Sequence, residues 1–330
     1  MRPAPATPQS DGISASGLTK AYGPTTGLFG VDLAVRPGTV TALLGPNGAG
    51  KTTAMRILTT LLKPDAGEVV IGGHDALREP QKVRAIIGIA GQTVSVDNRL
   101  TGLQNLTMFG RLCRLSKKGS RLRAASLLEQ FGLAPAAKLP VKSYSGGMRR
   151  KLDLAASLLV APPVLFLDEP TSGLDPASRA ALWGTISELA QGGSTVLLTT
   201  QYLEEADRLA DDVVLIDEGR VVATGAPQDL KARIGGARLD LTVATDADFA
   251  RLCTALAGLV IVTDQARRTV SVVLGGPGRP GLRDLAEALQ RAIGAEAGVE
   301  AFSLHQASLD DVFFQLTGRT KASAGIKEPN

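Results

Sequence analysis

The chain has 330 residues, of which 44% are hydrophobic and 4% aromatic, and its formal net charge at pH 7 is +4. At about 150 residues per domain, this length predicts two domains, each able to bury a sizeable core. The two cysteines, Cys113 and Cys253, lie far apart without CxxC spacing, which excludes a disulfide framework and a cysteine-based zinc site. A reduced, cytosolic setting is expected.

No stretch of the sequence predicts a membrane anchor. Residues 1–12 are proline-containing and lack the apolar core of a secretory signal, so they predict a disordered lead-in. The longest uncharged stretch, residues 154–167, is too short to span a bilayer and contains Pro162 and Pro163. We expect no segment of this chain to cross a membrane by itself.

Short alternating segments open the first predicted domain, which covers residues 13–234. Residues 13–23 and 28–38 alternate apolar and polar side chains, which predicts strands. The segment 39–62 then reads as strand, glycine loop and helix. A helical subdomain is predicted over about residues 95–160, where apolar side chains recur at helical spacing. Thr101 and Gln104 fit a capping box near its start.

Strand character returns at residues 164–170, 195–201 and 212–219, each followed by a helix, a turn or a second strand. Such alternation predicts an α/β fold, a mostly parallel sheet with helices on its faces.

A different pattern follows Gly235 and Gly236 and defines a second predicted domain over residues 237–318. Its order is strand, helix, strand, strand, helix, strand, which is the βαββαβ arrangement of a ferredoxin-like α+β domain. A final helix begins at Ser308, with Asp311 three residues on as a capping partner. Residues 319–330 are assigned as a tail.

Residues 45–53, GPNGAGKTT, match the phosphate-loop pattern G-x-x-x-x-G-K-[ST] between a strand and a helix. In such a loop, backbone N–H groups converge on a polyphosphate and Lys51 reaches its β and γ oxygens. Thr52 offers a hydroxyl to Mg²⁺, and the helix N-terminus adds a positive dipole. The predicted nucleotide-binding residues are Gly45, Pro46, Asn47, Gly48, Ala49, Gly50, Lys51, Thr52 and Thr53.

In VLFLDEP, residues 164–170, two carboxylates end a predicted buried strand. Asp168 is placed to bind Mg²⁺, directly or through water, and Glu169 is the better candidate for polarising an attacking water. Next to the phosphate loop, this pair predicts a nucleotide-hydrolysing site.

A second anion-binding end is predicted where Ser145, Gly146 and Gly147 precede a helix at residues 144–159. One phosphate loop already holds a nucleotide. The second end is most easily explained if it serves a nucleotide held by another copy of the chain.

The phosphate loop, YSGGM, LFLDEPTSGLD and TTQYLEEAD, in this order, resemble the motifs of ATP-binding cassette (ABC) ATPases. The resemblance covers residues 13–234 and implies two cassettes that close head to tail. Each ATP would then lie between the phosphate loop of one copy and the signature YSGGM of the other. ATP and Mg²⁺ are the implied cofactors.

The resemblance also implies individual roles, position by position. Tyr22 would stack on adenine, and Gln92 would contact Mg²⁺ and the transmembrane partner. Ser145, Gly146 and Gly147 would bind the γ-phosphate in trans, and Asp175 would link the two sites across the dimer. The implied catalytic residues are Lys51, Glu169 and Gln201, and the implied metal-site residues are Thr52, Gln92 and Asp168.

Two departures from the family pattern bear on activity. Tyr144 and Met148 stand where the signature usually has Leu and Gln, although its Ser-Gly-Gly core is kept. Gln201 stands at the usual histidine, and its amide donates hydrogen bonds but cannot become cationic. If the histidine positions groups, little is lost. If the histidine stabilises charge, turnover falls about tenfold or more. Each tenfold loss corresponds to a rise of ~1.4 kcal/mol in the activation free energy.

TTQYLEEAD and the closing SLDDVFFQLTGR are similar to the daunorubicin-resistance branch of ABC drug exporters. With Glu169 in place, we expect an active site of modest turnover. The leading hypothesis is an ATPase subunit at the cytoplasmic face of the membrane that drives a separate permease exporting a drug, antibiotic or lipid. A second cassette, expected as a homodimer, would complete its sites, and no nucleic acid is expected.

Two other functions stay open at this point. One is a soluble ABC ATPase acting on ribosomes or DNA, and another is a nucleotide-gated regulator with little hydrolysis. The first rests on a basic run that also fits a solvated helical face: Arg111, Arg114, Lys117, Lys118, Arg121 and Arg123. For the second domain, a dimer-supporting role and a ligand-sensing role both stay open.

Overall fold

The computed structural model describes residues 12–91, 96–233, 237–259, 261–275, 281–306 and 308–317. The predictions for the lead-in at residues 1–11, for Gln92, for Gly235 and Gly236 and for the tail at 319–330 lie outside these described residues. By its internal contacts the chain divides into two compact units, Met1–Thr224 and Gly225–Asn330.

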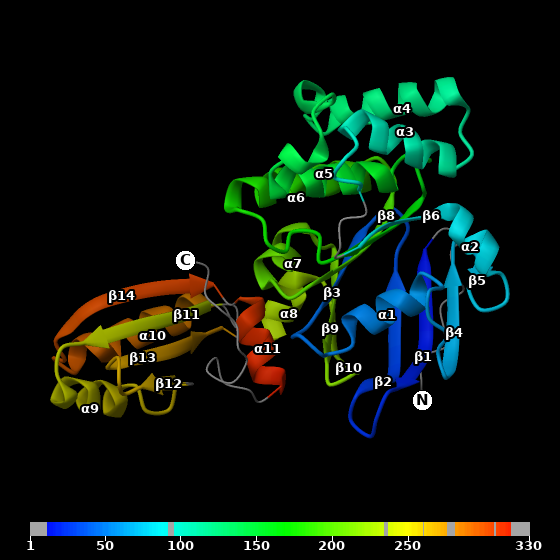
Figure 1. The fold of residues 1–330 in the computed structure, drawn as a ribbon. Helices are drawn as coiled ribbons and strands as arrows, with labels where there is room; N and C mark the ends of the chain where they lie inside the picture. The colour runs from blue at the N-terminus through cyan, green and yellow to red at the C-terminus, as the bar shows by residue number, and fades with distance from the viewer. Residues whose placement is uncertain are drawn as a thin grey trace. The chain divides into compact units, whose positions relative to one another are not determined.

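A mostly parallel sheet forms the centre of the first unit (Figure 1). Its strands, in spatial order, are β10 (Arg220–Gly225), β9 (Asp212–Asp217), β3 (Val40–Leu44), β8 (Thr195–Thr200), β7 (Val164–Asp168) and β6 (Ile87–Ala90). The pairs from β9 through to β6 are parallel, which confirms the predicted α/β sheet. Every residue of β3 and β8 is buried, as expected for a parallel sheet covered on both faces.

An antiparallel sheet lies next to the central sheet in the same unit. Its strands, in spatial order, are β2 (Gly27–Val35), β1 (Ile13–Ala21), β4 (Ala66–Ile71) and β5 (His74–Asp75). Leu18 of β1 and Leu43 of β3 belong to one buried cluster, together with Ile57 and Leu58 of the helix after the phosphate loop. This shared core holds the phosphate-loop helix against both sheets.

Seven α-helices and two short 3₁₀ turns complete the described part of the first unit. They are α1 (Lys51–Leu58), α2 (Pro80–Ile86), α3 (Gly102–Leu112), α4 (Lys117–Gln130), η1 (Ala134–Ala136), η2 (Val141–Ser143), α5 (Gly146–Ser157), α6 (Pro176–Gln191) and α7 (Leu203–Leu209).

Local capping explains where the helices of the predicted helical subdomain begin. The capping box of Thr101 and Gln104 is confirmed at the start of α3, because each side chain accepts a hydrogen bond from the other's backbone N–H. Ser116 caps α4 and Ser145 caps α5 through their hydroxyl oxygens. The Tyr144 side chain is buried and donates its hydroxyl to the Ala136 carbonyl at 2.7 Å, which anchors the residue before the α5 cap.

The second unit holds a four-stranded antiparallel sheet and four helices in its described residues. The elements in chain order are α8 (Pro227–Arg233), β11 (Ala237–Val243), α9 (Asp246–Ala255), β12 (Ile261–Asp264), β13 (Thr269–Leu274), α10 (Gly281–Gly294), β14 (Val299–Gln306) and α11 (Leu309–Thr317). The spatial order of its strands is β12-β13-β11-β14, and every neighbouring pair is antiparallel.

The core of the second unit follows from alternation along β11. Leu239, Leu241 and Val243 are buried together with Leu252 of α9 and Ala288 of α10, so one face of the sheet is covered by these two helices (Figure 1). The helix α8, which the sequence analysis placed in the first domain, packs instead against α11 in this unit.

Among the helices that the structure describes, none combines the length and the apolar character needed to cross a bilayer.

Candidate functional site

Parallel pairing brings three chain segments to one edge of the central sheet, where the carboxyl ends of β3, β8 and β7 meet. Leu44 of β3 lies opposite Thr200 of β8, and Asp168 of β7 lies opposite Thr199 of β8. The residues that follow these strands therefore leave the sheet side by side. They are Gly45, which begins the phosphate loop, Glu169 and Gln201.

The phosphate loop requires glycine at two positions for different reasons. A Cβ on Gly45 would stand 2.2 Å from the Ile216 carbonyl oxygen of β9, so only a hydrogen fits there. Gly50 has a φ of +108°, and a Cβ on it would meet Leu28 at 2.6 Å. The loop is thereby pressed against β2 and β9 and closes directly onto the first residue of α1.

The ammonium group of Lys51 lies inside this loop. Its Nζ donates to the carbonyl oxygens of Gly45 at 2.7 Å and Pro46 at 3.0 Å, and only 5% of the side chain is exposed. Burial lowers the pKa of Lys51, while the charges of Glu169 and Asp168 oppose that shift. Lys51 is thus a poorly hydrated cation beside the loop, where phosphate oxygens can replace its carbonyl partners.

The two carboxylates after β7 are held by Thr199 of the neighbouring strand. Its hydroxyl donates to Asp168 Oδ1 at 2.6 Å and accepts from the backbone N–H of Glu169 at 3.0 Å. Glu169 has a φ of +47°, a left-handed conformation that costs energy in a residue with a Cβ. In this conformation its Oε1 lies 3.9 Å from Lys51 Nζ.

The donor set at this edge fits Mg²⁺ bound together with a polyphosphate. Mg²⁺ prefers oxygen ligands and is usually held by one or two carboxylates, phosphate oxygens and waters. Asp168 supplies the carboxylate, and Thr52 presents an exposed hydroxyl at the start of α1. In the described ranges no group of three or more His, Cys, Asp or Glu side chains forms a cage that would hold a metal without the phosphates.

The signature residues lie in a second group, at the starts of α5 and α6. Ser145 and Gly146 are exposed, whereas a Cβ on Gly147 would meet Ser178 of α6 at 2.5 Å. Asp175 caps α6 by accepting from the Ser178 N–H at 2.9 Å, and this bonding lowers the pKa of Asp175. Gly147 and Asp175 therefore both lie next to Ser178. That Ser145, Gly146, Gly147 and Asp175 act on a second copy stays a prediction.

Three further predicted site residues are Tyr22, Gln201 and Gln92. Tyr22 follows β1 with 58% of its surface exposed, and its backbone N–H donates to Thr26. Gln201 is half-buried at the end of β8, where the Thr200 hydroxyl accepts from the Tyr202 N–H. Gln92 lies outside the described residues, directly after Gly91.

Arg150 is a residue of this region that the sequence analysis missed. It lies on α5, is 6% exposed, and binds four carbonyl oxygens. Its Nε donates to Pro170 at 2.7 Å, and its Nη2 donates to Asp168 and Glu169 at 3.0 Å each. Its Nη1 donates to Gly91, the residue before Gln92. One guanidinium thus joins the signature helix to the backbone of both carboxylate residues.

A sequence signal for Arg150 does exist. Arg150 and Asp153 are spaced i, i+3 on α5 and form a buried ion pair at 3.8 Å. Charged residues at positions that share a helix face with buried Gly147 and Leu154 predict a satisfied polar contact in the interior.

Glu205 is the second missed residue, hidden in the acidic segment after Gln201. It is fully buried on α7, and its Oε1 accepts from the Thr171 hydroxyl at 2.8 Å and the Trp183 Nε1–H at 3.1 Å. Burial raises its pKa, although hydrogen bonds from Thr200, Thr171 and Trp183 act against the shift. Glu205 therefore joins α7 to α6 and to the segment that follows Glu169.

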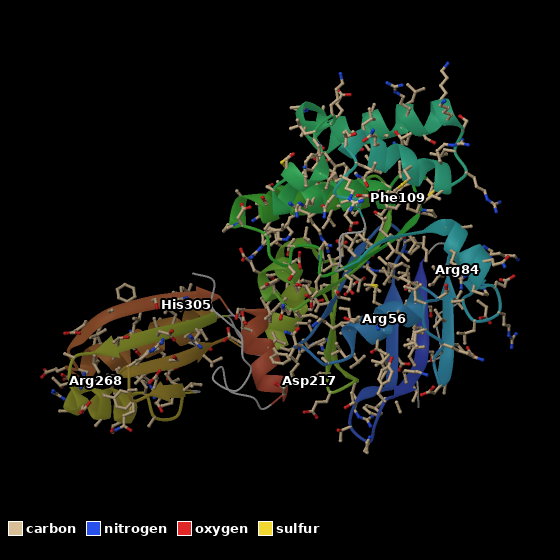
Figure 2. The ribbon with its side chains drawn as sticks, in the orientation of Figure 1. Arg56, Arg84, Phe109, Asp217, Arg268 and His305 are labelled. Carbon is tan, nitrogen blue, oxygen red and sulfur yellow. The ribbon has the colours of Figure 1, made fainter. Side chains whose placement is uncertain are left out.

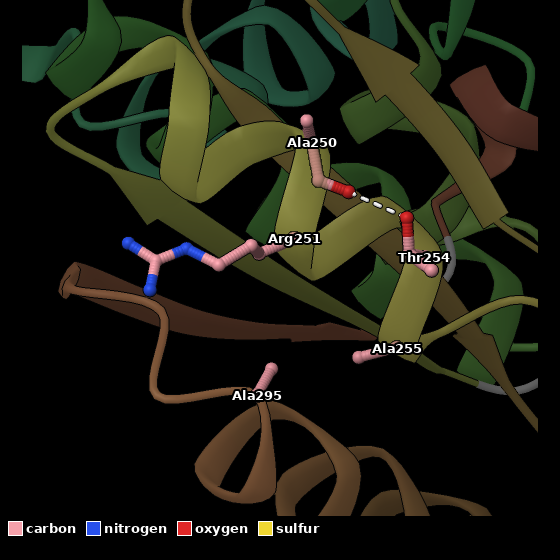
Figure 3. Close-up of a pocket in the computed structure, with 5 residues that line it drawn as sticks. All are labelled: Ala250, Arg251, Thr254, Ala255 and Ala295. Carbon is pink, nitrogen blue, oxygen red and sulfur yellow. Dashed lines mark hydrogen bonds between the residues drawn. The ribbon is translucent and has the colours of Figure 1, made fainter.

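One cavity in the second unit bears on the ligand-sensing alternative. It has a volume of about 430 Å³ and is lined by Ala250, Arg251, Thr254, Ala255 and Ala295 (Figure 3). Arg251 is paired with Asp248 at 2.6 Å, and the Thr254 hydroxyl donates to the Ala250 carbonyl. Because both polar side chains are engaged within α9, this cavity offers little to a polar ligand.

The buried Glu205 carboxyl predicts a specific dependence of stability on pH. A raised pKa means that the folded protein binds this proton more tightly than the unfolded chain. The contribution of this proton to the free energy of unfolding is complete below the pKa of a glutamate in the unfolded chain, about 4.3. It is lost as the pH rises through the pKa of Glu205 in the folded protein. Glu205→Gln keeps an acceptor for Thr171 and Trp183 but does not titrate.

We therefore expect the Tm of Glu205→Gln, relative to the unaltered protein, to rise as the pH is raised from about 4 to about 8. Thermal unfolding can be followed by the fluorescence of Trp183, the single tryptophan. Glu204→Gln, which alters the exposed neighbouring acid, is the control and should show no such trend. A Tm difference for Glu205→Gln that is constant with pH would contradict the buried titrating carboxyl.

Comparison with known proteins agrees with this geometry. The ABC transporter family profile matches residues 28–172. The daunorubicin resistance ATP-binding protein DrrA2 of Streptomyces coeruleorubidus is 49% identical over 316 residues, covering 96% of this chain and 98% of its own. The Nod factor export ATP-binding protein I of Ralstonia nicotianae is 37% identical, covering 96% and 97%.

A solved structure of an ATP-binding cassette also superimposes on this chain. It is a dimeric post-hydrolysis state bound to ADP and Pi, with a TM-score of 0.59 and 26% identity, and it covers 65% of this chain and 98% of its own. The cassette fold of the first unit and its ATPase activity follow from these likenesses. The chain therefore belongs to the ATP-binding proteins of ABC transporters, in the branch that holds the daunorubicin resistance proteins.

Proposed function

We propose that this ATPase is the energy-supplying subunit of an exporter whose membrane-spanning permease is a separate polypeptide. The observation that supports this proposal most strongly is the division of the site into two groups. One group is the phosphate loop with the carboxylates at the sheet edge, and the other is exposed Ser145 and Gly146 at the start of α5. The proposal is supported by relatives named for drug resistance and for Nod factor export.

In this proposal ATP lies between two copies of the chain. The loop N–H groups and Lys51 of one copy hold the β- and γ-phosphates. The γ-phosphate also meets Ser145, Gly146 and Gly147 of the facing copy at its helix N-terminus. The support for the second half is that Ser145 and Gly146 are exposed at the start of α5, where the Ser145 hydroxyl caps the helix.

Hydrolysis then uses groups that the sheet edge brings together. Glu169 accepts a proton from a water that attacks the γ-phosphorus, and the bond to the β–γ bridging oxygen breaks to leave ADP. Gln201 donates its amide hydrogen to a phosphate oxygen. Mg²⁺ would be held by Thr52, Asp168 and Gln92 and would neutralise charge on the phosphates. Tyr22 is proposed to stack on adenine, and Asp175 to link the paired sites.

Closure and reopening of the paired cassettes would drive the permease. ATP favours the closed pair only if it binds that state more tightly than the open one, which the divided site provides. We place the assembly at the cytoplasmic face of the membrane, with the permease near Gln92. A hydrophobic drug, antibiotic or lipid is the proposed cargo, by analogy with the named relatives.

We also propose that the second unit is a ferredoxin-like domain that supports pairing of the cassettes. The support for the fold is its spatial strand order β14-β11-β13-β12 with antiparallel neighbours and two helices on one face. The support for the role is the edge strand β14, on which Phe302 and Leu304 are 73% and 54% exposed.

The proposed role of Glu169 predicts a selective loss of turnover. Glu169→Gln removes the proton acceptor but keeps the side-chain size, so phosphate release should fall by about a hundredfold or more while ATP binding is retained. Glu188→Gln alters an exposed acid on α6 and should leave both unchanged. If the unaltered protein released phosphate no faster than Glu169→Gln, a regulator without useful hydrolysis would replace this proposal.

The contacts of Arg150 predict a positioning role for it. In Arg150→Lys a single ammonium replaces a planar fork and cannot reach all four carbonyls, so the carboxylate segment shifts. We expect kcat to fall by about tenfold or more with a smaller change in ATP affinity. The matched control is Arg56→Lys, an exposed arginine on α1 (Figure 2). Unaltered kcat in Arg150→Lys would contradict the positioning role.

A further inference from the structure

An unusual charge distribution marks the turn between α3 and α4. From residue 98 to residue 128 the sequence contains no aspartate or glutamate. The cations in this interval are Arg99, Arg111, Arg114, Lys117, Lys118, Arg121 and Arg123. Surfaces of soluble domains usually intersperse both signs of charge, so an interval of this length with one sign only needs an explanation.

The structure gathers most of these cations at one corner, which we call the basic corner: Arg111, Leu112, Arg114, Lys117, Lys118, Arg121 and Leu122. All seven side chains are exposed. Figure 2 shows side chains with blue nitrogen atoms projecting outward from α4. Arg123 is excluded because its guanidinium turns inward to the carbonyls of Leu158 and Leu159.

The cations of the basic corner are not neutralised by acidic side chains of the described residues. No ion pair joins any of them to an acidic side chain within the part of the chain that the structure describes. Lys117 and Arg121 are spaced i, i+4 on α4, so these two like charges lie on adjacent turns and repel each other. A corner of this kind is more stable when anions lie against it.

Two large apolar side chains stand among these charges. Leu112 is 71% exposed at the end of α3, and Leu122 is 63% exposed on α4. Met108, one turn before Leu112 on α3, is 37% exposed. Exposed leucines also occur elsewhere in this chain, at Leu61 and Leu282. At this corner they stand among unpaired cations, and a segment that lies in a membrane interface presents both kinds of side chain.

We propose that the basic corner binds an anionic lipid bilayer directly, independently of the permease. Lysine and arginine side chains are attracted to the negative surface potential of anionic headgroups. Leu112 and Leu122 would enter the boundary between headgroups and acyl chains. A nucleic acid is the other polyanion that fits the charge. It would engage the cations but would gain little from the leucines, and single strands are usually held by exposed aromatic side chains.

The first test uses the purified full-length chain without any permease. Its binding to vesicles of neutral phosphatidylcholine, with and without anionic phosphatidylglycerol, is measured by flotation. Strong binding to the anionic vesicles only is expected, and it should weaken as salt is raised. Replacing Lys117, Lys118 and Arg121 together by Gln should weaken it by about a hundredfold. Lys63→Gln, Arg78→Gln and Arg283→Gln together remove the same charge from exposed sites elsewhere and should not.

The leucines separate a bilayer from a nucleic acid. Leu112→Ser with Leu122→Ser should weaken vesicle binding by about tenfold or more and leave binding of a single-stranded RNA oligonucleotide unchanged. The exposed Cys113 lies between Leu112 and Arg114, so an environment-sensitive fluorophore on it, in a Cys253→Ser background, should report a less polar setting on vesicles.

Several results would overturn the proposal. One is equal binding of neutral and anionic vesicles, or none of either. Another is unchanged vesicle binding in the triple cation variant. RNA binding tighter than vesicle binding, with no effect of the leucine changes on vesicles, would assign the corner to a nucleic acid. The basic corner is remote in sequence from the phosphate loop, so its substitutions should not alter ATP binding directly. Retained ATP binding therefore shows that each variant is folded.

Discussion

The parallel pairing of β3, β8 and β7 is the constraint on which the site depends. Pairs such as Leu44 with Thr200 and Asp168 with Thr199 fix where each strand ends. They therefore fix where the phosphate loop, the carboxylates and Gln201 begin. A one-residue slip in this register would reverse the face of every side chain on the strand and separate Thr199 from Asp168.

The position of Glu169 at this end of the sheet is fixed by its backbone conformation and by hydrogen bonds to its backbone. Glu169 is held in a left-handed conformation, which persists only because its N–H and carbonyl are both bound by neighbours. Thr199 binds the N–H, and Arg150 binds the carbonyl. Because Arg150 lies on the helix that Ser145 caps, any movement of that helix would also move the donor that binds the Glu169 carbonyl.

The repetitive parts of the fold were predictable from the sequence. Mostly apolar segments such as Val40–Leu44 form buried parallel strands as predicted, and Thr101 with Gln104 forms the predicted capping box. The phosphate-loop motif has glycine at Gly45 and Gly50, and the structure gives a physical reason for both, which is the close approach of β9 and of Leu28.

What the sequence did not reveal depends on contacts between distant segments. Arg150 binds carbonyls up to 59 positions away in the chain, and backbone acceptors carry no side-chain signature. The importance of Glu205 comes from its burial against Trp183, which periodicity in a seven-residue helix cannot reveal. The assignment of α8 to the second unit likewise follows from its packing on α11 and not from local composition.

The central claim is that each catalytic site needs two copies of the chain, and complementation tests it most directly. Lys51→Ala lacks a working phosphate loop and Ser145→Arg lacks a working signature, so each should be inactive alone. In an equal mixture, half of the pairs would hold one intact site, and phosphate release should return to about a quarter of the unaltered rate. A mixture as inactive as its components, or full turnover by Ser145→Arg alone, would contradict the account.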